Sequence, residues 1–141
     1  MSSAPPAGCC EAAHDCVFAK AVLARSAACE LARRHLVGER ELLACGSPIA
    51  RMNCATLAAL LHERARFALR LPAPGRPLMH MQALRLQCGG LDALRGWLRA
   101  GEADVHLMVR QAQQARGSLA ELPWDQLVPS LVAWQPARRR R

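Results

Sequence analysis

Hydrophobic residues recur at helical spacing along most of the chain, and no stretch alternates for long between apolar and polar positions. Alanine and leucine dominate while β-branched residues are scarce, which favours helices over strands. The clearest helix begins at Ser47, a suitable N-cap, followed by Pro48 at the first helical position. It is predicted to run to about Leu71, where a series of prolines prevents continuation.

Shorter helices are predicted elsewhere, separated by glycine, serine and proline. The expected ranges are about 11–25, 27–37, 39–45, 78–88, 91–100 and 102–116, with short pieces after Pro123 and Pro129. Gly89 and Gly90 are interpreted as the end of one helix and the turn into the next. We therefore predict an all-α fold, a compact single-domain array of five to seven helices. A disordered lead (residues 1–8) precedes the helical domain (9–136), and a basic tail (137–141) follows it.

The composition indicates a globular protein of one domain. The chain has 141 residues, of which 52% are hydrophobic and 21% charged, too apolar for a disordered protein. No secretory signal is visible at the N-terminus, and the longest apolar run, Met52 to Leu61, is too short to span a bilayer. These features predict a cytoplasmic protein with no membrane partner, in which thiols stay reduced.

Positive charge is concentrated at the C-terminus. The formal net charge is +8, and four of these charges are Arg138, Arg139, Arg140 and Arg141. The rest of the chain is only mildly basic and has few aromatic residues on which bases would stack. Nucleic-acid binding through this tail is therefore a possible function with weak support.

The seven cysteines are the most informative feature. Cys9 and Cys10 fall in or beside the predicted lead, and an adjacent pair does not easily face one point. The spacing of the other five contains no C-x2-C pair, which argues against zinc fingers, thioredoxin-like sites and ferredoxin motifs. The odd number of cysteines also argues against complete disulfide pairing.

The predicted placement of these cysteines is more specific than their spacing. Cys45 and Cys88 each precede a glycine at a predicted helix end, and Cys29 follows a predicted break at Ser26. Thiolates converging from helix ends and corners suit a four-cysteine cluster. The candidate ligands are Cys16, Cys29, Cys45 and Cys54, with Cys88 in reserve. The predicted function is a small metalloprotein that binds an iron–sulfur cluster for electron transfer or sensing, with zinc as the second choice of metal.

Two other interpretations remain open at this stage. The cysteines are small and hydrophobic enough simply to fill a helical core. Four residues spaced three, four and three apart near the C-terminus also form an apolar stripe, which suits either a protein partner or the chain's own core. These residues are Trp124, Leu127, Leu131 and Trp134. The alternative function is therefore a metal-free helical adaptor or regulator that binds a protein through this stripe or nucleic acid through the arginine tail.

Sequence signatures of enzymes are absent. The chain contains no Walker-type phosphate loop, no G-x-S-x-G elbow and no H-E-x-x-H motif. No pair of carboxylates stands in an apolar context that would favour acid–base chemistry. We therefore predict no catalytic residues. If the chain binds a metal, we expect its partner to be a redox or regulatory protein.

Overall fold

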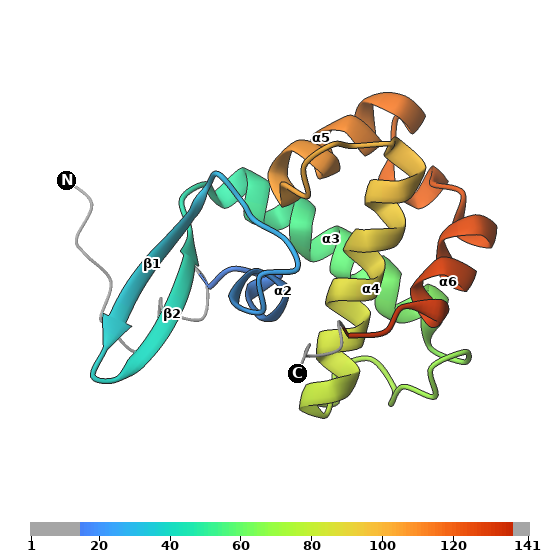
Figure 1. Ribbon diagram of the computed structural model, residues 1–141. Coiled ribbons are helices and arrows are strands. Elements are labelled where there is room, and N and C mark those ends of the chain that lie inside the picture. The colour runs from blue at the N-terminus through green and yellow to red at the C-terminus, as the bar shows by residue number, and fades with distance from the viewer. Residues whose placement is uncertain (1–14, 137–141) are drawn as a thin grey trace, which may run out of the picture.

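The computed structural model of the chain describes residues 15–136 as a group of helices with one projecting β-hairpin (Figure 1). The predicted lead (1–8) and tail (137–141) lie outside the described residues. No helix within residues 15–136 has both the length and the apolar character needed to cross a bilayer. The elements are α2 (Ala19–Leu23), β1 (Ala32–Val37), β2 (Arg40–Cys45), α3 (Pro48–Ala65), α4 (His80–Leu98), α5 (Val105–Arg116), a 3-10 helix (Leu119–Glu121) and α6 (Trp124–Ala133).

The hairpin shows that the all-α prediction was wrong, although the described residues are mostly helical. The segments predicted as helices over 27–37 and 39–45 instead form β1 and β2, which pair antiparallel from Ala32 opposite Cys45 to Val37 opposite Arg40. A two-residue turn joins the strands, and Gly38 occupies its first position with φ +65°. Glycine adopts this left-handed conformation without steric cost, which suits a tight hairpin.

Strand β1 is almost entirely exposed to solvent, whereas β2 is partly buried. In β1 only Ala32 is partly buried, and in β2 only Leu43 is fully buried. Leu36 and Val37, near the tip, keep 74% and 51% of their surface exposed. Figure 1 shows the two strands extending away from the helices.

The helices α3 and α4 form the centre of the remaining structure. Helix α4 packs against α2, α5 and α6, and α3 packs against α4, α5 and α6. Helix α3 begins as predicted, because the Ser47 side chain accepts a hydrogen bond from the Ala50 N–H at 3.2 Å. It ends at Ala65 rather than near Leu71, and turns fill residues 66–70. The helix expected over 11–25 is helical only over Ala19–Leu23 within the described residues.

One continuous helix, α4, replaces the two helices predicted over 78–88 and 91–100. Gly89 and Gly90 lie in its interior, where they allow close packing instead of a turn. A Cβ atom on Gly89 would lie 2.9 Å from the carbonyl oxygen of Leu131 in α6. A Cβ atom on Gly90 would lie 2.7 Å from the Leu61 side chain in α3. The absence of two side chains therefore lets α4 approach both neighbouring helices.

Candidate functional site

Four cysteines from four different segments line one small enclosed cavity. They are Cys16, Cys29, Cys45 and Cys54, and the lining also includes Arg51 and His106. Each of the four was predicted as a first-choice metal ligand. The structure therefore brings together residues that are separated by up to 38 positions in the sequence.

The hairpin and helix α3 position three of these cysteines. The backbone N–H of Cys16 donates to the Leu43 carbonyl at 3.0 Å, which fixes the chain before α2 against strand β2. Cys45 is the last residue of β2, and its thiol donates to the Ser47 carbonyl oxygen at 3.2 Å. Cys54 lies in the second turn of α3 on its buried side.

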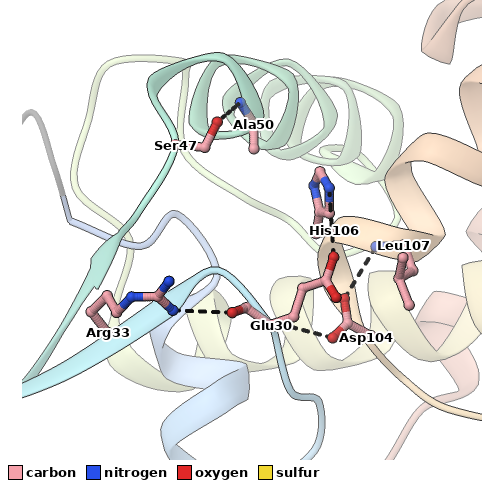
Figure 2. A network of polar contacts seen from close by, with 7 residues as sticks. All are labelled: Glu30, Arg33, Ser47, Ala50, Asp104, His106 and Leu107. Atoms are coloured by element: carbon pink, nitrogen blue, oxygen red, sulfur yellow. Dashed lines mark hydrogen bonds and ion pairs between the residues drawn. The ribbon is translucent and has the colours of Figure 1, made fainter.

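Cys29 lies in a loop that is fixed to the start of α5. Ala28 pairs with the chain around residue 104: its N–H donates to the Ala103 carbonyl, and its carbonyl accepts from the Val105 N–H, both at 2.8 Å. On the other side of Cys29, the Glu30 N–H donates to Asp104 Oδ2 at 2.9 Å. Figure 2 shows Asp104 between Glu30 and Leu107, whose N–H donates to Asp104 Oδ1 at 3.1 Å. Asp104 therefore caps α5 and holds the Cys29 loop at the same time.

Backbone N–H groups point at two of the four sulfurs. The Cys16 sulfur accepts from the backbone of Phe18, and the Cys29 sulfur accepts from the backbones of Leu31 and His106. Such hydrogen bonds stabilise sulfur that carries negative charge, and they tune the potential of iron–sulfur clusters. These donors favour the thiolate forms of Cys16 and Cys29, against the larger effect of burial.

Burial favours the protonated form of three of the four thiols in the metal-free protein. Burial, with a smaller contribution from the nearby sulfurs of Cys29, Cys16 and Cys45, raises the pKa of Cys54 from the ordinary 9.0 to about 12. Burial also raises the pKa of Cys16 and of Cys29, against the opposing effect of their N–H donors. A metal that entered the cavity would therefore have to displace thiol protons.

The cavity is small as it stands. Its volume is about 10 Å³, close to the minimum space that one water molecule occupies. Within residues 15–136, no three His, Cys, Asp or Glu side chains are arranged so that they would hold a metal ion. Cys29 and Ala32 also line an open hollow of about 640 Å³ on the solvent side, with Arg25 and Arg34 on its walls. The hollow and the cysteine cavity therefore share Cys29 and Ala32 as wall residues.

Two cavity residues, Arg51 and His106, were not among the predicted site residues. Arg51 donates from Nε to the Asp15 carbonyl at 2.9 Å, and its charge favours the thiolate forms of Cys16 and Cys54. His106 lies with Nε2 at 3.8 Å from Glu30 Oε1, as Figure 2 shows. Arg51 lies about one helical turn before Cys54 in α3, whereas His106 reaches the cavity because the Cys29 loop is fixed to the start of α5.

The reserve ligand Cys88 lies apart from this group. It is in α4, only 1% exposed, and it does not line the cysteine cavity. Its thiol contacts the side chain of Ser26, and burial raises its pKa. Its surroundings fit the packing interpretation that the sequence left open.

The C-terminal stripe packs mainly against the chain itself. Trp124, Leu127 and Leu131 are buried in the core, and Trp134 is partly buried against it. The indole N–H of Trp124 donates to the Ala120 carbonyl at 3.2 Å. In this conformation the stripe has little surface left for a partner. The predicted nucleic-acid contacts, Arg138 to Arg141, lie outside the described residues.

Comparisons with known proteins give no relative for this site. No protein-family profile matches the chain, and neither a curated protein nor a solved structure matches it significantly. The site must therefore be understood from its own residues.

Replacing Asp104 by alanine is expected to loosen the Cys29 loop and the start of α5 together. The change removes the acceptors for two N–H groups, and loss of a helix cap costs about 1–2 kcal/mol of unfolding free energy. Urea denaturation of the metal-free protein measures this loss. Asp104→Asn is the matched intermediate, because its single amide oxygen can keep the cap on Leu107 while its NH2 group cannot accept from the Glu30 N–H, so only part of the stability should be retained. Equal stability of Asp104→Ala and the unchanged protein would contradict the role given to Asp104.

The metal-free protein is expected to lose stability as the pH rises above about 9. Thiols of the unfolded chain ionise near 9.0, whereas Cys54 keeps its proton in the folded state until about pH 12. The stabilising contribution is therefore complete below pH 9 and is lost between these values, by up to about 1.4 kcal/mol per pH unit for one thiol. Urea midpoints at pH 7.5, 9 and 10.5 measure the slope, which should be shallower in Cys54→Ala. An unchanged slope in that variant would contradict the assignment.

Proposed function

We propose that this chain is a small cysteine-ligated metalloprotein in which Cys16, Cys29, Cys45 and Cys54 hold an iron–sulfur cluster for electron transfer or sensing. The observation that carries the proposal is the common cavity that these four thiols line. A cluster of this kind takes four cysteine ligands around one centre. The proposal includes a reducing compartment, the cytoplasm, because the thiols must remain free to bind metal.

The backbone donors support a charged sulfur site over simple packing. Three N–H groups are directed at the sulfurs of Cys16 and Cys29, and the Arg51 guanidinium lies close enough to favour two thiolates. When bound, a cluster would supply one-electron chemistry at this place. The chain's own residues would hold its sulfur ligands, donate hydrogen bonds to them and limit the access of water.

The absence of a C-x2-C pair favours a cluster over a single zinc ion, which such pairs commonly hold. As they are placed within residues 15–136, the side chains form no group that would hold a metal ion of either kind. A cluster spreads its four cysteines over several iron atoms, so their sulfurs stand further apart. The cavity of about 10 Å³ is nevertheless too small for a cluster. Binding therefore requires the thiols to rotate outwards, and the hollow beside Cys29 offers space on that side.

Anaerobic purification tests the proposal directly. The full chain is purified without oxygen, its visible spectrum is recorded, and iron, acid-labile sulfide and zinc are measured against protein. Iron and sulfide together with visible absorption would support the cluster. A protein that contains zinc alone would keep the four-cysteine site and reject the cluster. A folded, colourless chain that stays metal-free, even after incubation with ferrous iron and sulfide, would overturn the proposal.

A further inference from the structure

A second cavity lies at the opposite end of α3 from the cysteines. Its volume is about 590 Å³, within the range of about 300–1,000 Å³ that is usual for small-molecule sites. The turns after α3, the first turns of α4 and the end of α6 surround it. Its walls include Leu71, Met81 and Trp134, with Arg70 and Arg85 among them. We call this cavity the Trp134 pocket.

The surroundings of the Trp134 pocket carry positive charge without acidic residues to balance it. From Arg64 through Leu91, both included, the sequence contains five arginines and neither aspartate nor glutamate. None of the ion pairs found within residues 15–136 involves any of these five arginines. An anion in the pocket would therefore meet guanidinium groups that are not already neutralised by a carboxylate of the described chain.

The fold holds the side chain of Arg85 and the backbone of Arg70 in place. Arg85 donates from Nη2 to the carbonyls of Val132 and Trp134, at 3.3 and 3.5 Å, and so connects α4 to the end of α6. Arg70 has a left-handed backbone with φ +54°, which is unfavourable for a residue with a side chain. The Leu71 N–H donates to the Arg66 carbonyl at 2.9 Å and closes this turn. The Arg85 guanidinium, fixed in this way, loses little freedom when a ligand binds, and the Arg70 side chain starts from a fixed position of the backbone.

Exposed apolar side chains accompany the pocket. Met81 lines it and is 56% exposed, and Phe67 and Met79, in the adjoining segments, are 87% and 72% exposed. The Trp134 ring is the large aromatic group of the wall. Apolar surface beside uncompensated positive charge matches a ligand that has a hydrocarbon part and one acidic group.

We propose that the Trp134 pocket binds a small amphiphilic anion, a hydrocarbon chain or ring that ends in a carboxylate or phosphate. The hydrocarbon part lies against Leu71, Met81 and Trp134, and the acidic group faces Arg70 and Arg85. This inference does not depend on the cysteine site, because the two cavities share no lining residue.

Calorimetric titration with monomeric decanoate tests this proposal, with decanol as the uncharged analogue and anionic phospholipid vesicles as the membrane-bound source. Saturable binding of one decanoate per chain, at least tenfold tighter than decanol, is expected. Arg70→Gln should weaken decanoate binding about tenfold and leave decanol unchanged, since a charge-assisted contact contributes about 1.5–3 kcal/mol. Arg110→Gln removes the same charge from the exposed side of α5, and it should alter the affinity for decanoate less than twofold.

A steric pair makes the test independent of charge. Ala68 is exposed and lines the pocket, so Ala68→Trp should fill it and abolish binding without disturbing the core. Ala55→Trp, on an exposed position of α3 outside the pocket, is the matched control. Equal weakening by Arg70→Gln and Arg110→Gln, binding to vesicles only, or no saturable binding of decanoate would each overturn the proposal.

Discussion

Replacing Gly89 by alanine is expected to destabilise the protein, whereas the same replacement at Gly96 in the same helix should stabilise it. At Gly89 the new methyl group would lie 2.9 Å from the Leu131 carbonyl oxygen and 3.1 Å from Trp134 Cβ. The backbone oxygen cannot rotate away, so α6 must move. Overpacking of this kind costs about 1–3 kcal/mol. At Gly96 nothing lies within 4 Å, and alanine gains up to about 1 kcal/mol of helix propensity.

Urea denaturation of the two variants beside the unchanged protein measures the contrast. We expect their unfolding free energies to differ by about 2 kcal/mol, with the unchanged protein between them. If both variants were stabilised, α4 and α6 would not approach each other as closely as described. Trp134 contacts Gly89 and also lines the Trp134 pocket. The Gly89 variant should therefore weaken decanoate binding as well, and the Gly96 variant should not.

Replacing Cys29 or Cys45 by alanine is expected to abolish cluster binding, and replacing Cys88 should leave it intact. Loss of an outer-shell partner already weakens metal affinity roughly 10–100-fold, and loss of a ligand should weaken it more. Cys29 and Cys45 line the common cavity, whereas Cys88 is buried elsewhere in α4. The readouts are visible absorption and the iron content of protein that has been purified or reconstituted without oxygen.

The control for this comparison is the fold of each variant. Circular dichroism and urea denaturation should show that all three variants are folded, so that lost absorption reports ligation and not collapse. Cys88→Ala removes a thiol of the same size from a more deeply buried place. Equal loss of iron in all three variants, or unchanged iron in Cys29→Ala and Cys45→Ala, would contradict the ligand assignment.

Strand β1 could not be predicted from the hydrophobic pattern because it buries almost nothing. Alternation reveals a strand when one of its faces is buried, but five of the six residues of β1 are exposed. The local signal was the turn, where Gly38 takes a positive φ between two short segments. The helices predicted over 27–37 and 39–45 treat Gly38 as a break between two helices, but glycine also opens two-residue hairpin turns.

The interior glycines of α4 were misread for a related reason. Gly89-Gly90 looks like a helix end when only the sequence is considered, but here the two residues leave space for Leu131 and Leu61. Tertiary packing thus overrides local propensity. The start of α3, by contrast, depends only on the neighbouring residues Ser47 and Pro48, and its prediction is confirmed.

Some features of the candidate site could be predicted from neighbouring residues in the sequence, and others depend on contacts between distant segments. Chain corners near Cys29 and Cys45 could be expected from Ser26 and Gly46, although the elements that meet there are strands. Arg51 lies three residues before Cys54 in α3, so a helix alone brings these two side chains to one face. The position of His106 depends on a pairing between distant segments, Ala28 with Asp104. One sequence contains no direct signal for such pairings. The four cysteines were chosen for their chemistry, and their ligation of a metal stays a prediction.

The hairpin also has a consequence for how the molecule opens. An isolated two-stranded hairpin is at best marginally stable in water, and this one has little core of its own. Its order must therefore come from its base, where Cys29 precedes one strand and Cys45 ends the other. A centre that bound both residues would close this segment into a loop and restrict its unfolded states, as a disulfide does. Binding of a centre to Cys29 and Cys45 would then slow hydrogen exchange of the backbone amides near the tip of the hairpin, although these amides do not contact the centre.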